Sequence, residues 1–220
     1  MGARTLALTE RDWTTFKGGA EALKWNRRDV SALDAVLRLV PGRTACVQAG
    51  GHLGVYPKRL AQEFATVYTF EPAPALFPLL LANAPEPNIV RFQAALGAKA
   101  ELVRLSQTRR DGKPNAHEGV THVSGPGVIP TMRLDDLALA TLDLVCLDIE
   151  GWELYALQGA AQTIARCKPV LMVEINKNLG FVGIEPDAVR GYIEGFGYRF
   201  VERHQSDEVF VPVDRMERAA

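Results

Sequence analysis

With 220 residues, of which 47% are apolar and 23% are charged, the chain is long enough to form one globular domain with a full hydrophobic core. Its 25 basic and 26 acidic side chains leave a formal net charge of −1, so no overall basic field would attract nucleic acid. No apolar run approaches the roughly 18 residues of a membrane-spanning helix, and the first residues lack the apolar segment of a signal peptide, so we expect a cytoplasmic protein with no membrane partner.

Residues 1–43 are predicted to form a helical segment that packs on the core of a larger domain at residues 44–220. Apolar side chains recur at helical spacing in the second half of this segment, at Val30, Leu33, Val36, Leu37 and Val40. The Pro-Gly pair that follows is expected to end the helix, because proline cannot continue it.

Short β-like runs alternate with helical patterns from residue 44 onward, which predicts an α/β fold with a largely parallel sheet. Strands are predicted at residues 44–50, 66–71, 88–96, 143–148 and 168–176. Helices are predicted at residues 55–64, 75–83 and 185–196, and a further helix is predicted after the fourth strand, where Leu154, Leu157, Ala161 and Ile164 recur at helical spacing. The runs "YRFVER" and "EVFVPV" are predicted to close the chain as an antiparallel pair.

Residues 106–130 interrupt this alternation with a polar stretch that is rich in glycine and proline. The stretch is long for a connection inside a compact domain, and such loops are usually functional lids or disordered. Its side chains include His117 and His122, which we expect to be solvated, and Arg109, Arg110 and Lys113. The three basic residues are expected to form either a solvated face or a contact for an anionic acceptor.

A glycine-rich turn, "AGGHLG", follows the first predicted strand and places Gly50, Gly51 and Gly54 before a helix. Glycine there tolerates positive φ and lets the backbone approach a ligand, while the helix N-terminus presents N–H groups to an anion. The spacing is not the dinucleotide-binding pattern, and a merely structural tight turn is the alternative.

The second predicted strand ends in Glu71, in the run "TFEP". An acid at this place is positioned to hydrogen-bond both hydroxyls of a ribose. Together, the glycine turn and the acid indicate an adenosine-type ligand, and a solvated glutamate at the strand end is the alternative.

Three more acids gather where the fourth and fifth predicted strands end. Asp148 ends the fourth strand, Glu150 begins the helix that follows, and Glu174 ends the fifth strand. Ligands of open α/β sheets bind at the carboxyl ends of the strands, so these acids are expected to line the crevice. Glu153 is expected instead to pair with a basic side chain such as Arg133 or Lys177.

The run "VCLDIEGWELYALQGA" resembles the signature of FkbM-type S-adenosylmethionine-dependent methyltransferases, and "TFEP", "TMRLDDL" and "KPVLMVEIN" match other blocks of that family in order. The resemblance covers about residues 44–176. It implies a Rossmann-like class I methyltransferase fold, with a seven-stranded mostly parallel sheet, an antiparallel last strand and helices on both faces. It also implies S-adenosylmethionine as the cofactor of the domain at residues 44–220.

Cofactor contacts follow from the same resemblance. The three glycines of the turn would pack against the methionine part, Glu71 would hold the ribose, and Asp148 would lie nearest the sulfonium and the acceptor. Gln93 and Ala94, which end the third strand, would border the adenine.

Two residues depart from the family pattern at the glycine turn. Gln48 stands where the family usually has an acid; it can accept a hydrogen bond from the methionine ammonium but offers no charge. His52 stands where the family usually has asparagine, and it would bind the methionine carboxylate or face the acceptor.

The expected function is methylation of a hydroxyl on a small molecule, sugar or natural product. Methyl transfer depends on positioning, and a hydroxyl acceptor also needs a base for its proton. Asp148 is the first candidate for this base, Glu174 the second, and Glu150 completes the set. Alternatives are a non-catalytic binding module in which Gln48 weakens cofactor binding, methylation of a macromolecule, and a divalent metal held by Asp148, Glu174 and Asn176.

Overall fold

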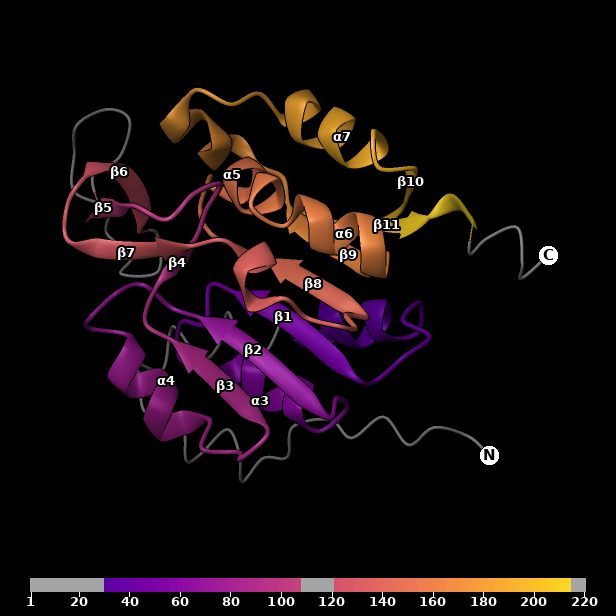
Figure 1. Cartoon of the computed structure of the whole chain (residues 1–220), viewed down its shortest axis with the longest axis horizontal. Coiled ribbons are helices and arrows are strands. Elements are labelled where there is room, and N and C mark those ends of the chain that lie inside the picture. The colour runs from indigo at the N-terminus through magenta and orange to yellow at the C-terminus, as the bar shows by residue number, and fades with distance from the viewer. Residues whose placement is uncertain (1–29, 108–120, 215–220) are drawn as a thin grey trace.

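In the computed structural model of the chain, residues 30–107 and 121–214 are described, and they form two β-sheets with helices around them (Figure 1). The first sheet has seven strands in the order β10-β11-β9-β8-β1-β2-β3. The strands are β1 (Ala45–Ala49), β2 (Thr66–Phe70), β3 (Ile89–Phe92), β8 (Leu144–Leu147), β9 (Val170–Glu174), β10 (Tyr198–His204) and β11 (Asp207–Pro212).

Strand directions confirm the predicted Rossmann-like class. β3, β2, β1, β8 and β9 pair in parallel, whereas β11 is antiparallel to both of its neighbours, β9 and β10. The last strand of the chain is therefore the antiparallel one, as predicted. The connecting helices are α3 (Val55–Ala61), α4 (Phe77–Asn83), α5 (Glu153–Gln158), α6 (Ala161–Cys167) and α7 (Pro186–Glu194), with 3₁₀ helices η1 (Leu134–Leu137) and η2 (Lys177–Val182).

A second sheet, which the sequence did not predict, has the strand order β4-β7-β5-β6. Its strands are β4 (Ala95–Leu96), β5 (Leu102–Ser106), β6 (His122–Pro126) and β7 (Ile129–Met132). Figure 1 shows that it lies beyond the carboxyl ends of the parallel strands. It therefore borders the edge of the first sheet at which ligands bind in this class of fold.

The second sheet corrects two predictions. The expected strand at residues 88–96 is interrupted, because β3 ends at Phe92 and the chain turns before it enters β4. The expected loop at residues 106–130 contains β6 and the start of β7, whose Gly and Pro residues are tolerated at a bulge and at short strands near a sheet edge. Residues 108–120, with Arg109, Arg110, Lys113 and His117, lie outside the described residues.

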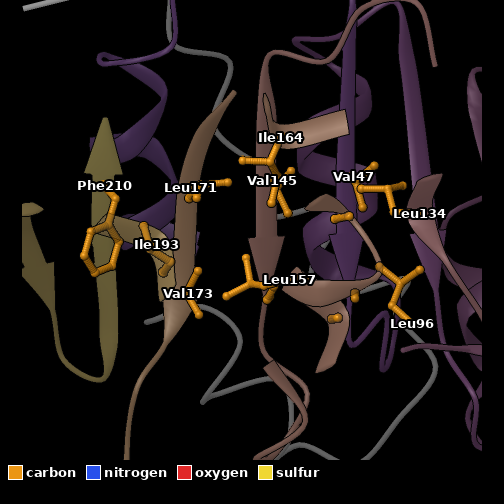
Figure 2. Packing of buried hydrophobic residues seen from close by; sticks show 14 of the residues in the cluster. Val47, Leu96, Leu134, Val145, Leu157, Ile164, Leu171, Val173, Ile193 and Phe210 are labelled. Carbon is orange, nitrogen blue, oxygen red and sulfur yellow. The ribbon is translucent and has the colours of Figure 1, made fainter. Parts of the chain in front are cut away.

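The hydrophobic core has two halves, one on each face of the first sheet. Successive strand residues point to opposite faces, so Val47 joins one cluster and Cys46 the other. Figure 2 shows the first half, in which Val145 and Leu171 of the sheet lie against Leu157 and Ile164 of the α5–α6 segment. Because both faces are covered, the central strands are mostly apolar, with Gln48 of β1 and Thr69 of β2 as buried polar exceptions.

The helix at residues 30–37 packs into the second half of the core through Leu33, Val36 and Leu37. Arg59 of α3 anchors it: the fully buried guanidinium contacts Asp34 over 2.8 Å and Glu63 over 3.0 Å. The described end of the N-terminal segment is thus part of the same core as the sheet.

The single helix predicted from Leu154, Leu157, Ala161 and Ile164 is divided in two at Gly159. A Cβ atom at this position would lie 1.9 Å from the carbonyl oxygen of Gly97, so the chain passes too close to the second sheet for any other residue. Asp135 of η1 then caps α6, because its carboxylate accepts N–H bonds from Thr163 over 2.8 Å and Gln162 over 3.2 Å.

Candidate active site

The turn after β1 is fixed between the ends of its two neighbouring strands. The N–H groups of Gly50 and Gly51 both donate to the carbonyl oxygen of Phe70, over 3.0 and 2.9 Å. Gly50 has a φ of 88°, and a Cβ atom there would lie 1.9 Å from the carbonyl oxygen of Asp148. Glycine is required because the turn is held against both β2 and β8.

The other glycines of the turn also face the protein. A Cβ atom at Gly51 would lie 2.2 Å from a methyl group of Leu80 in α4, and one at Gly54 would lie 3.1 Å from the Cβ atom of Ala84. Gly54 has a φ of 86° and precedes the first residue of α3. These glycines shape the turn, and their predicted contact with the methionine part of a cofactor remains a prediction.

Gln48 is buried beneath the turn with both ends of its amide engaged. Its Nε2 donates to the carbonyl oxygen of Gly50 over 2.8 Å, and its Oε1 accepts from the hydroxyl of Thr69 over 2.7 Å. The amide thus joins β1, β2 and the turn. The predicted bond from Gln48 to a cofactor ammonium would have to share the oxygen that Thr69 already uses.

Glu71 follows β2 directly and is held by two backbone groups. Its Oε2 accepts from the N–H of His52 over 2.7 Å, and its Oε1 accepts from the N–H of Ala73 over 2.8 Å. Burial raises the pKa of Glu71, and the two N–H bonds oppose that rise. Each carboxylate oxygen keeps a second lone pair, so this rigid group retains the capacity to accept two ribose hydroxyls.

His52 lies beside Glu71 in the left-handed backbone region, with a φ of 45°. Residues other than glycine adopt this region infrequently, so the backbone of His52 is held there by the turn. On the far side of β2, Gln93 is exposed and Ala94 is buried just after β3 ends. The stacked rings of Phe70 and Phe92, with centroids 4.7 Å apart, fix these two strand ends relative to each other.

Glu153 organises the turn that follows β8, contrary to the predicted ion pair with Arg133 or Lys177. It is 1% exposed, and its Oε1 accepts from the N–H groups of Ile149 and Gly151 over 3.0 and 3.2 Å. Arg133 pairs instead with Asp135 and Asp136 of η1. Burial raises the pKa of Glu153 to about 7, against the opposing effect of the backbone bonds.

Glu150 lies within this turn, with a φ of 56°, and not in the helix, because α5 begins at Glu153. Its Oε2 accepts from Nδ2 of Asn178 in η2 over 2.5 Å. Gly151 is required here, since its φ is 102° and a Cβ atom would lie 2.4 Å from the carbonyl oxygen of Asn178. Burial, followed by the charge of Asp148, raises the pKa of Glu150 to about 8.

Asp148 and Glu174 occupy the carboxyl ends of the neighbouring strands β8 and β9. Asp148 is exposed, whereas Glu174 is half-buried and lies opposite Asp207 of β11. Burial raises the pKa of Glu174 strongly, and the charge of Asp148 raises it further. The structure therefore brings the three predicted catalytic acids together, with Asp148 as the accessible member and its neighbours favouring their protonated forms.

Within the described residues, no group of three or more His, Cys, Asp or Glu side chains is arranged to hold a metal ion. Asn176, which the metal alternative requires, accepts the N–H of Asn178 over 2.6 Å and caps η2. None of the described helices is both long and apolar enough to cross a membrane.

Sequence reasoning missed the residues that η2 and β6 contribute beside the acids. Asn178 contacts Glu150, and Phe181 stacks on His122, which is buried rather than solvated. The short sequence "INKNLGFVG" gives little sign of a 3₁₀ helix, and β6 lies in a stretch with the composition of a loop.

Comparison with known proteins gives one family match and several similar folds. A family model described as Methyltransferase FkbM domain matches residues 52–200, more than half of the chain. No curated protein matches the chain significantly.

The similar solved structures are distant in sequence. The methyltransferase FkbM from Methylobacillus flagellatus KT has a TM-score of 0.54 and 19% identity, over 77% of this chain and 43% of that one. This chain thus spans less than half the length of that protein. Magnesium protoporphyrin IX methyltransferase from Synechocystis PCC 6803, with bound SAM, has a TM-score of 0.50 and 13% identity over 92% and 90% of the two chains. Precorrin-6y C5,15-methyltransferase from Geobacter metallireducens GS-15 also has a TM-score of 0.50, with 10% identity over 94% and 98%.

Proposed function

Because the chain belongs to the FkbM methyltransferase family, we propose that it transfers a methyl group from S-adenosylmethionine to a hydroxyl of a small molecule or glycan. One observation carries the proposal. β1 lies between β2 and β8, so its glycine turn separates the rigid acid Glu71 from the accessible acid Asp148 at one edge of the sheet. A solved protein of similar fold holds SAM, which supports the same cofactor here.

The residues at this edge fit the cofactor. Glu71 is fixed by two backbone N–H groups and keeps lone pairs for the two ribose hydroxyls. Gln93 is exposed at the end of β3, where an adenine would lie, and the Gly50 turn lies between the two acids. When bound, S-adenosylmethionine supplies a methyl group on a positively charged sulfur, which an acceptor oxygen displaces in line.

Asp148 accepts the proton of the acceptor hydroxyl in this proposal. The raised pKa values of Glu150, Glu153 and Glu174 keep those carboxyls protonated over a wider range of pH, so the negative charge of the cluster resides on Asp148. A carboxylate in this state orients the hydroxyl and receives its proton as the new C–O bond forms. Glu150 and Glu174 stay protonated in this proposal, so they add no negative charge beside Asp148.

The cofactor part of the proposal is tested by calorimetric titration with S-adenosylmethionine and S-adenosylhomocysteine. We expect micromolar binding that weakens at least tenfold in Glu71→Ala. Glu194→Ala, which removes an exposed glutamate of α7, is the matched control and should bind like the unaltered protein. Absence of binding to either ligand, in a protein with a cooperative unfolding transition, would overturn the proposal and favour a non-catalytic binding module.

The transfer part is tested with methyl-labelled S-adenosylmethionine and a panel of hydroxyl-bearing acceptors. We expect labelled methyl ethers, identified by mass spectrometry, and a loss of at least a hundredfold in rate for Asp148→Asn, with unchanged affinity for S-adenosylhomocysteine, whose sulfur is uncharged. Transfer to amines instead of hydroxyls would contradict the proposed acceptor chemistry.

A further inference from the structure

Two buried polar atoms on one face of β6 have no hydrogen-bond partner in the described part of the chain. They are Nδ1 of His122, a residue that is 8% exposed, and Oγ of Ser124. Residues two apart in a strand point to the same face, so both atoms lie on one side of β6. Buried polar groups in folded proteins are nearly always hydrogen-bonded, so this pair calls for a partner that the described residues do not supply.

The face that carries these atoms is turned toward η2. The imidazole of His122 stacks on the ring of Phe181 with centroids 4.2 Å apart and planes inclined by 6°. The regular pairing of β6 with β5 ends just after His122 at a β-bulge. There, Ser124 and Gly125 together lie opposite Arg104 of β5. Bulges of this kind redirect side chains, and they often lie next to binding sites.

η2 connects this face to the acids of the active site. Asn178 and Phe181 are three residues apart, and a 3₁₀ helix has three residues per turn, so both side chains lie on the same face of η2. Asn178 contacts Glu150, and Phe181 contacts His122. The two contact points are therefore one turn apart, a rise of about 6 Å along the helix axis.

We propose that His122 and Ser124 form an acceptor subsite that holds a second hydroxyl of a neutral, polyhydroxylated acceptor, beside the hydroxyl that is methylated. The subsite rests on the proposed function, because it gives a place to the substrate of that reaction. His122 Nδ1 accepts a hydrogen bond from the ligand, and Ser124 Oγ donates or accepts one. Phe181 covers the imidazole and fixes the plane in which its nitrogen points.

The charges near the subsite determine which class of ligand it can hold. Glu150, which contacts η2 one turn away from the subsite, lies beside Asp148, and the carboxylate of Asp148 would repel an anionic ligand. Burial also lowers the pKa of His122, which favours the neutral imidazole with one accepting nitrogen. A sugar-like polyol meets both conditions, whereas a phosphate or a uronic acid does not.

The test uses protein saturated with S-adenosylhomocysteine, titrated with methyl α-D-glucopyranoside and methyl α-L-rhamnopyranoside as neutral probes and with glucuronate as the anionic probe. Binding affinity is measured by calorimetry in every protein, and in the proteins that keep His122 the ring ¹⁵N signals of this residue are also followed by NMR. Three variants are compared: His122→Phe, which keeps the ring stack and removes the nitrogens; Ser124→Ala, which removes only the hydroxyl; and His204→Phe, a control in β10.

We expect at least one neutral probe to shift the His122 Nδ1 signal, with affinity about tenfold weaker in His122→Phe and Ser124→Ala and unchanged in the control. Glucuronate should bind more weakly than either glycoside. S-adenosylhomocysteine affinity should be the same in all variants.

Two results would overturn the subsite. One is that no neutral probe perturbs His122 in the loaded protein, and the other is that binding is equal in all variants. In both cases normal binding of S-adenosylhomocysteine would leave the proposed function standing, whereas loss of that binding in the unaltered protein would overturn both proposals. Ser124→Ala keeps the test decisive even where His122→Phe unfolds.

Discussion

The side-chain amide of Asn178 donates a 2.5 Å hydrogen bond to Glu150, and this bond joins η2 to the turn after β8. It opposes the rise in the pKa of Glu150 that burial and Asp148 cause. Asn178 thereby couples the protonation of the acid turn to the position of the helix that also carries Phe181.

Replacing Asn178 tests this coupling. Asn178→Ala removes the bond and should raise the pKa of Glu150 above about 8, at a cost of about 1 kcal/mol in the free energy of unfolding. Asn178→Asp should cost more at pH 8 than at pH 5, because two carboxylates then face each other. Carbon-detected NMR titration of Glu150 and urea unfolding at both pH values measure these effects. Equal stability of the two variants at pH 8 would contradict the assigned contact.

The buried acid Glu153 should make the protein less stable as pH rises. Its pKa is about 7 in the folded chain against 4.5 for an unperturbed glutamate, so the folded state binds the proton more tightly than the unfolded state. The resulting stabilisation is fully present below about pH 4.5 and is lost as pH rises through 7, with a total on the order of 3 kcal/mol.

Glu153→Gln isolates this effect, since the amide oxygen can still accept the N–H bonds of Ile149 and Gly151. The free energy of unfolding of this variant, from urea titrations between pH 4.5 and 8, should fall less with pH than that of the unaltered protein. Glu194→Gln, on the surface of α7, should follow the unaltered protein. Parallel curves for all three proteins would show that Glu153 keeps an ordinary pKa.

Gly50 and Gly183 form a matched pair for testing the turn after β1. Both have positive φ, 88° and 73°, but a Cβ atom at Gly50 meets the Asp148 carbonyl oxygen at 1.9 Å while one at Gly183 meets nothing within 4 Å. Gly183→Ala should cost about 1 kcal/mol, the strain of the left-handed region alone. Gly50→Ala should cost at least about 3 kcal/mol by chemical denaturation, because β1 and β8 must also separate. Similar costs for both would mean that the close approach is not rigid.

Gln48→Glu introduces the acid that the resemblance led us to expect at this position, and we expect it to destabilise this chain. The new carboxylate would be buried opposite the carbonyl oxygen of Gly50, where the amide now donates a hydrogen bond. We expect a loss of about 3 kcal/mol at pH 7, and partial recovery at pH 5 as the carboxyl is protonated. Gln158→Glu, at an exposed position of α5, is the control. Unchanged stability with tighter S-adenosylmethionine binding would instead show that the turn rearranges around an acid.

The sequence predicted the first sheet well because burial on both faces leaves a direct trace in composition. β8 is a continuous apolar run and β1 is interrupted only by Gln48, and each strand is followed by a glycine or an acid where it ends. The second sheet left no such trace, because its strands are short, half-exposed and interrupted by Gly125 and Pro130.

Side-chain roles were harder to predict where the partner is backbone. Glu153 was expected to pair with a cation, yet one of its carboxylate oxygens accepts two N–H groups of its own turn instead. Periodicity cannot show such bonds, since they depend on the φ angles of Glu150 and Gly151. His122 was misjudged for a related reason: its burial comes from η2, which is distant in sequence.

The family model matches a shorter segment of the chain than the first sheet spans. The family match begins after β1 and ends within β10, so it omits both β1, in the middle of the sheet, and β11, which lies between β9 and β10. A chain trimmed to residues 52–200 would lack the strand that joins the cofactor half to the acid half, and β10 would have no neighbour. The segment that folds cooperatively is therefore longer than the segment that the family model matches. The ends of the family match would be poor places to truncate this domain.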